Sequence, residues 1–134
     1  MSRRAIVTAV ALVVGTQSAG ATCNNGTMTG TWGYHYTSVD FNSSTFCSGV
    51  GAMKFSSPNH AQVIGGKVSC NGGLVSSFGS GTYSMASSCL GRVTLIANTG
   101  ATLNYYLSVT NGGKEVDFVL GLDGVTLSGS GKKQ

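Results

Sequence analysis

The sequence predicts an all-β protein, an antiparallel eight-stranded up-and-down barrel. Helical periodicity is absent beyond the N-terminal segment, where glycine, serine, threonine and asparagine are frequent and Pro58 is the sole proline. These residues disfavour helices and favour turns. Apolar residues instead recur at every second position in short runs, and glycine-containing turns separate the runs. That alternation is the pattern of strands with one buried face.

The alternation places eight strands along the chain in a regular order. Their approximate ranges are 30–37, 48–55, 60–69, 78–85, 90–97, 102–109, 114–121 and 124–130. Three of the later connections, at 98–100, 111–113 and 123–124, contain the asparagine, aspartate and glycine residues of tight hairpin turns. Each strand has one apolar and one polar face, as expected for antiparallel sheet with one side in water.

The apolar faces can be assigned strand by strand. In chain order they carry Trp32, Tyr34 and Tyr36; Met53 and Phe55; Tyr83 and Met85; Val93 and Leu95; Leu103, Tyr105, Leu107 and Val109; and Val116, Phe118 and Leu120. Short links between eight strands favour a closed barrel, which leaves no exposed sheet edge. Glycines on strand positions, such as Gly51, Gly66 and Gly81, supply the bends that a small barrel needs. A two-sheet β-sandwich is the alternative.

Residues 1–21 are expected to be a cleaved signal peptide. Arg3 and Arg4 precede a ten-residue apolar run, and Ala19-Gly20-Ala21 fits the cleavage site. A run of this length is too short to span a bilayer, which needs about 20 residues. Residues 22–134 then form a single β-barrel domain that is secreted or periplasmic, with no membrane insertion after cleavage. An outer-membrane barrel is disfavoured, because the aromatic residues gather on the first strand instead of in two girdles.

Four cysteines in an exported chain predict two disulfides. Sequence alone leaves three pairings open. An up-and-down topology ranks Cys47–Cys70 first, together with Cys23–Cys89, because each pair then lies at one end of the barrel. The pairing Cys23–Cys47 with Cys70–Cys89 would have to join opposite ends. No metal site is expected, since no C-x-x-C pair exists and neither histidine has ligand-like spacing to the cysteines.

The sequence predicts no catalytic residue, no cofactor and no nucleic-acid partner. Loss of Arg3 and Arg4 lowers the net charge from +4 to +2, and no basic stripe remains. The two histidines, His35 and His60, are expected to be surface or structural residues. Glu115 and Asp117 are two residues apart on one strand, and their position on a solvent-exposed outer face is a sufficient explanation for this spacing. No G-x-S-x-G elbow or phosphate-binding glycine loop is present.

The concentrated signal is aromatic, and it predicts a small apolar ligand in the lumen. An eight-stranded barrel is just wide enough to be filled by side chains or to hold one small molecule. The candidate lumen residues are Trp32, Tyr34, Tyr36, Phe55, Tyr83, Tyr105 and Phe118. Two alternatives remain: a cyclase or isomerase with Tyr34, Tyr36 or Tyr105 as proton donor, and a solid barrel that serves as a structural or surface interaction module. The oligomeric state is left open.

Several short motifs carry a resemblance to known proteins. Thr29-Gly30-Thr31-Trp32 resembles the G-x-W opening of lipocalins and the T-G-T-W opening of avidins, although avidins use several tryptophans and this chain has one. Gly81-Thr82-Tyr83, then the segment 89–95 (CLGRVTL) and the late segment 114–118 (KEVDF), are similar to small secreted bacterial barrels of unassigned function, near the allene-oxide-cyclase-like group. Ser88 departs from the Asp that these chains often have before the cysteine. The resemblance implies a barrel and export, with no catalytic residue to transfer.

Overall fold

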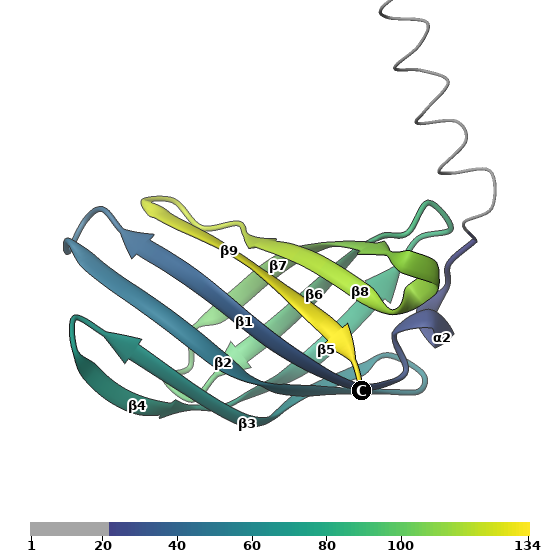
Figure 1. The fold of residues 1–134 in the computed structure, drawn as a ribbon, viewed down its shortest axis with the longest axis horizontal. Coiled ribbons are helices and arrows are strands. Elements are labelled where there is room, and N and C mark those ends of the chain that lie inside the picture. The colour runs from purple at the N-terminus through teal and green to yellow at the C-terminus, as the bar shows by residue number, and fades with distance from the viewer. Residues whose placement is uncertain (1–21) are drawn as a thin grey trace, which may run out of the picture.

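The computed structural model describes residues 22–134, and the expected signal peptide at 1–21 lies outside this range. One antiparallel sheet closes on itself into a barrel (Figure 1). Eight strands form the ring in chain order: β1 (Gly30–Asp40), β2 (Thr45–Ser56), β3 (His60–Cys70), β5 (Gly79–Met85), β6 (Leu90–Ala97), β7 (Thr102–Thr110), β8 (Glu115–Leu120) and β9 (Val125–Lys133). Pairing of β9 with β1 closes the ring. The eight-stranded barrel is confirmed, and the sandwich alternative is wrong because the described strands form one sheet.

A ninth strand, β4 (Gly73–Ser77), was not predicted. β4 and β5 pair with successive parts of β3, and Phe78 separates them. Only Leu74 and Val75 are apolar in β4, too few to show an alternation. β1, β2 and β3 also run beyond the predicted ends, so that the β1–β2 and β3–β4 hairpins project past the rest of the ring (Figure 1).

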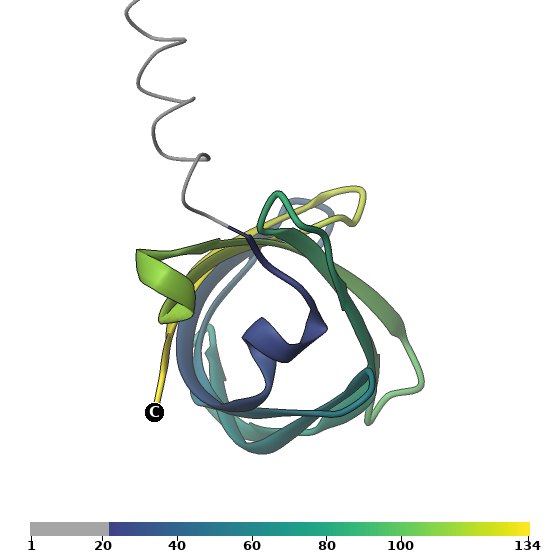
Figure 2. The ribbon, with the colours of Figure 1, turned by 90° about the vertical axis from the view of Figure 1, so that its right-hand side faces the viewer.

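One helical turn covers the opposite end of the barrel. Helix α2 (Asn25–Met28) lies across this opening in the end-on view of Figure 2. Asn24 and Thr27 form a reciprocal capping box, which fixes the turn locally. A 3-10 turn, η1 (Asn111–Gly113), connects β7 to β8. Within the described chain, no helix is long and apolar enough to cross a membrane.

The two disulfides join the cysteine pairs that the alternating topology ranked first. Cys47 and Cys70 are opposite each other on β2 and β3, with Cα atoms 4.1 Å apart. Cys23 and Cys89 lie at the α2 end, with Cα atoms 5.0 Å apart. The second bridge ties the segment that carries α2 to the barrel wall, so α2 is a fixed cover of this end.

The C-terminus is fastened to the same end as α2. The Lys133 ammonium donates a hydrogen bond of 2.8 Å to the Thr27 carbonyl, and it lies 5.6 Å from the centre of the Trp32 ring. The Gln134 amide donates to the Thr31 carbonyl at 2.9 Å. The first and last described segments of the chain therefore contact each other around α2.

Glycines make room for the large rings of β1. The Tyr36 ring lies against Gly49 of β2, in the space that a Cβ atom there would occupy. The Tyr34 hydroxyl similarly lies 2.6 Å from the Cβ position that an alanine at residue 51 would have. These two glycines therefore let the tyrosine rings lie against the β2 wall of the lumen.

Candidate functional site: the barrel lumen

The barrel is not solid, because a cavity of about 170 Å³ lies in its lumen. Met28 of α2 and Trp32 of β1 form the floor and are almost completely buried. At the other end the cavity reaches Phe78 and Asn98, both exposed to solvent. The cavity is therefore closed by α2 and opens at the opposite end of the barrel.

The structure brings most of the predicted lumen residues together along the cavity. The wall includes six of the seven: Trp32, Tyr34, Tyr36, Phe55, Tyr105 and Phe118. Tyr83 is not part of the wall. Its ring packs against Phe55 with centroids 5.0 Å apart, and its hydroxyl donates to the Asn25 carbonyl at 3.2 Å beneath the floor. Tyr83 therefore points inward but lies in the buried core at the end of the lumen that α2 fills.

Sequence reasoning also missed cavity residues at both ends of the lumen. Met28 was assigned to no element, and Ser77, Phe78 and Asn98 were read as strand margins or turns. The Asn24-x-x-Thr27 spacing before the first strand is a capping signal that could have located α2, and with it Met28. The three residues at the open end carry no comparable signal.

Aromatic rings line one side of the cavity in contact with each other. Tyr34 and Tyr36 are stacked with centroids 6.2 Å apart. Phe118 of β8 meets Tyr34 edge-on at 6.4 Å and Tyr105 of β7 edge-on at 6.1 Å. Edge-on and offset contacts at these distances are the favourable arrangements for aromatic rings. The rings hold each other in place and present a largely apolar wall.

The polar atoms of the aromatic residues differ between the floor and the cavity. The Trp32 indole donates a hydrogen bond of 2.8 Å to the Met28 carbonyl, and the Tyr83 hydroxyl also has a backbone partner. The Tyr34 hydroxyl interacts with the Ser77 side chain at the open end. No hydrogen bond within the described chain involves the hydroxyl of Tyr36 or Tyr105. Neither hydroxyl is a buried atom without a partner, so both are accessible donors that a molecule in the cavity can meet.

Burial keeps the three cavity phenols protonated. Burial first, then the charges that Tyr36 and Tyr34 would carry, raise the pKa of Tyr105 to about 12. Burial also raises the pKa of Tyr36, and Tyr34 adds to this. The pKa of Tyr34 is raised by burial and partly lowered by its hydrogen bond with Ser77. Neighbouring phenols thus add to the effect of burial on the pKa values of Tyr36 and Tyr105.

The pKa of Tyr105 predicts a loss of stability at alkaline pH. Between about pH 10 and pH 12 the unfolded chain releases the Tyr105 proton while the folded chain retains it. The free energy of unfolding therefore falls as pH rises through this window. Urea denaturation at several pH values from about 9 to 12 measures the slope, and Tyr105→Phe should give a shallower slope than the wild type. An equal slope in the two proteins would contradict the assignment.

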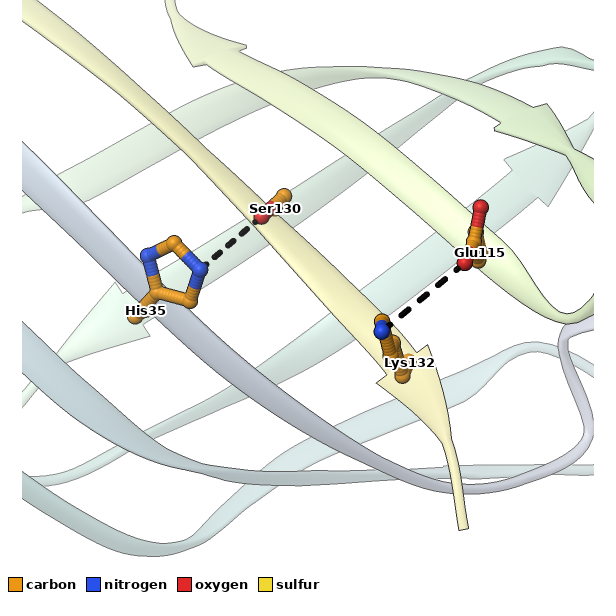
Figure 3. A network of polar contacts seen from close by, with 4 residues as sticks. All are labelled: His35, Glu115, Ser130 and Lys132. Atoms are coloured by element: carbon orange, nitrogen blue, oxygen red, sulfur yellow. Dashed lines mark hydrogen bonds and ion pairs between the residues drawn. The ribbon is translucent and has the colours of Figure 1, made fainter.

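The remaining titratable candidates lie on the outer wall, away from the cavity. Figure 3 shows His35 of β1 hydrogen-bonded to Ser130 of β9 at 3.1 Å, and Lys132 within 4.0 Å of Glu115. All four side chains belong to the outer face, where such an ion pair contributes little to stability. Asp117 is opposite Ser130 in the β8–β9 register, so it does not orient His35. Residues 22–134 contain no cluster of three or more potential metal ligands.

Comparisons with solved structures support the fold. No family model and no curated protein matches the sequence. The chain is similar to a de novo designed fluorescence-activating β-barrel, with 20% identity over 82% of this chain and 96% of that one, at a TM-score of 0.55. A redesigned barrel bound to the dye DFHBI has 16% identity, coverage of 80% and 99%, and a TM-score of 0.51. A designed transmembrane β-barrel has 15% identity, coverage of 78% and 94%, and a TM-score of 0.57. At these identities the likeness shows the barrel fold alone.

Proposed function

We propose that this protein binds a small, largely apolar molecule in the barrel lumen, and that the molecule carries a hydrogen-bond acceptor. The observation that carries the proposal is the pair of tyrosine hydroxyls, Tyr36 and Tyr105, that face an otherwise apolar cavity without a protein partner in the described chain. Neither hydroxyl is a buried atom, so both can be reached from the cavity, and a ligand there can take the place of water as their partner. A neutral acceptor such as a carbonyl oxygen would satisfy them.

The volume limits the ligand to about the size of one ring. An apolar protein cavity of about 150 Å³ holds one benzene molecule, and the lumen here is slightly larger at about 170 Å³. No Lys, Arg, Asp or Glu lies among the cavity residues. A charged ligand would lose its hydration without gaining a counter-ion, so a neutral molecule fits best. The redesigned barrel bound to DFHBI is an instance of the same fold bound to a small molecule.

The protein is proposed to act outside the cytoplasm, secreted or in the periplasm. Two disulfides without a free cysteine in the described chain support an oxidising compartment. The N-terminal signal pattern supports export from the sequence side. The same cavity phenols are the proton donors that a cyclase or isomerase would use. A pKa of about 12 at Tyr105 favours hydrogen-bond donation over proton transfer near neutral pH, so binding is the proposal that we adopt.

Matched ligands test the role of the two hydroxyls. Acetophenone and α-methylstyrene have nearly the same shape, and only the ketone has an acceptor oxygen. We expect acetophenone to bind, and Tyr105→Phe with Tyr36→Phe to weaken its binding by about tenfold, the value of one net hydrogen bond. The binding of α-methylstyrene should change little, because the apolar wall is retained. Ligand-observed NMR or isothermal calorimetry measures both affinities.

Two results would count against the proposal. If neither compound binds, the lumen is not a site for a ring-sized molecule. If the double variant weakens both ligands equally, the hydroxyls do not recognise an acceptor and the apolar wall alone accounts for binding. Native mass spectrometry of the exported protein complements this test, because a mass lost on denaturation would reveal a ligand that was acquired during export.

A further inference from the structure

Large apolar side chains are exposed around the open end of the barrel. We call this set the apolar rim, and each member has at least 49% of its surface exposed: Phe41, Phe46, Leu74, Val75, Phe78 and Leu122. Single exposed apolar residues are common on protein surfaces. A set gathered at the mouth of a cavity is not, and such sets mark sites of interaction.

The rim is built on three turns that are fastened to each other. The Phe41 amide donates a hydrogen bond of 2.8 Å to the Gly124 carbonyl, which joins the β1–β2 turn to the β8–β9 turn. The Asn71 amide donates to the Phe46 carbonyl at 2.9 Å, and the Asn71 side chain accepts from the Phe46 amide at 3.0 Å. These bonds join the β3–β4 turn to β2. The Cys47–Cys70 disulfide lies directly beside them. The backbone at Phe41 and Phe46 is therefore tied to the neighbouring turns.

The charges of the two barrel ends differ. The rim segments 40–46, 71–75 and 121–125 contain Asp40 and Asp123 and no lysine or arginine. Lys114, Lys132 and Lys133 lie at the closed end, near α2 and η1. The outer wall also carries exposed apolar residues, but Lys67, Arg92 and Asp117 are interspersed among them; the apolar wall residues are Val50, Ile64, Leu90, Ile96, Tyr106 and Val119. The molecule is thus apolar and weakly acidic at the mouth, and basic at the opposite end.

We infer that the apolar rim docks onto an electrically neutral lipid surface, so that the mouth of the lumen faces the lipid. This inference rests on the proposed function in one respect, since it names the place from which an apolar ligand would enter. A second copy of this chain is a poorer occupant, because rim-to-rim contact would bring the Asp40 and Asp123 carboxylates of both copies together, and Lys67 on the β3–β4 hairpin already donates to Ser76 of its own chain. A zwitterionic headgroup layer carries no such net charge. The rim also adjoins the cavity at Phe78, so a molecule could pass from lipid to lumen without crossing water.

Vesicle flotation tests the inference with phosphatidylcholine vesicles at about 0.15 M salt. The full chain is exported to an oxidising compartment and purified, and a double variant, Phe41→Ser with Leu74→Ser, is compared with the wild type. These residues lie outside the cavity wall. We expect the wild type to float with the vesicles and the variant to bind at least about tenfold more weakly, as the loss of buried Phe and Leu surface requires. Phosphatidylglycerol is avoided in this comparison, because it would attract the lysines of the closed end.

A matched control shows whether vesicle binding depends on the apolar rim or on any exposed apolar residue. Val50 and Leu90 are exposed by 57% and 59% on the outer wall and are not rim residues. The double variant Val50→Ser with Leu90→Ser should retain vesicle binding. Equal loss in both double variants, or a wild type that does not float, overturns the inference. So does a dimer, detected by sedimentation without lipid, that only the rim variant dissociates.

Binding of acetophenone in solution distinguishes a failure of this inference from a failure of the proposed function. The rim variant should bind acetophenone as the wild type does, since its cavity is unchanged. Vesicle binding without acetophenone binding would leave the docking surface standing and remove the ligand proposal. The reverse result would leave the lumen site standing and remove the docking surface.

Discussion

Trp32→Ala is expected to lower the free energy of unfolding by about 3–5 kcal/mol, the range for truncation of a large buried aromatic residue. Trp32 is 2% exposed and is the largest fully buried side chain of the described chain. Its removal leaves a void between α2 and the barrel, and it leaves the Met28 carbonyl without the indole donor. It also removes the ring beside the Lys133 ammonium. The expected loss of unfolding free energy therefore comes both from lost packing and from lost contacts that hold α2 and the C-terminus in place.

Trp32→Phe separates these contributions. Phenylalanine keeps most of the apolar volume but cannot donate to the Met28 carbonyl. We expect a smaller loss, about 1–3 kcal/mol, from the smaller ring and an unpaired buried carbonyl. Urea denaturation followed by far-UV circular dichroism measures both variants, because the intrinsic tryptophan signal is lost with the side chain. A Trp32→Ala cost below about 1 kcal/mol would show that Trp32 is not the floor of a packed lumen.

Removal of the Cys23–Cys89 bridge is expected to destabilise the protein by about 2–5 kcal/mol. The bridge closes a loop with a sequence separation of 66 residues, and it cross-links the segment before α2 to the β5–β6 connection. The double variant Cys23→Ser with Cys89→Ser avoids a free thiol. Its α2 segment would retain the hydrogen bonds of Asn25 and Lys133 but would open more often.

The second bridge supplies the control. Cys47→Ser with Cys70→Ser removes a loop with a separation of only 23 residues, at the open end. Loop-closure entropy makes this loss smaller by about 1 kcal/mol. Hydrogen exchange should distinguish the two variants further, since only the first should lose protection at the Met85 amide, which donates to the Asn25 side chain at 2.8 Å. Equal protection in both variants would contradict the role of the first bridge as the fastening of α2.

Most of the barrel could be predicted because its residues alternate. Trp32, Tyr34 and Tyr36 point inward for the same reason that His35 points outward, namely that successive side chains of a strand face opposite sides. Closure followed from short links, and the cysteine ranking followed from closure. β4 escaped prediction because its pairing with β3 depends on the long projecting hairpin, which is a tertiary feature. Phe78 separates β4 from β5, and the residues around it contain no sequence signal for an interruption of the strand.

The residues of the cavity wall could be predicted from the sequence, but the residues that close one end and open the other could not. Period-two alternation identifies Tyr105 and Phe118 as inward-facing, but it says nothing about which layer of the lumen is filled. That depends on α2, a single turn whose Met28 occupies the lower layer and which displaced Tyr83 from the ligand site. The residues of the open end could not be predicted either. Ser77 and Asn98 lie at the mouth because neighbouring strands differ in length.

The contacts between the N-terminal and C-terminal segments determine which end of the barrel a fused domain or an immobilising tag would occupy. The Lys133 ammonium and the Gln134 amide bind carbonyls of Thr27 and Thr31, so both ends of the described chain leave the molecule on the side of α2. A domain fused at either terminus, or a surface that holds the protein by a terminal tag, would sit behind the closed end. The mouth would then point away from the attachment point, free to exchange its contents. Attachment at either terminus would therefore leave the open end of the lumen accessible.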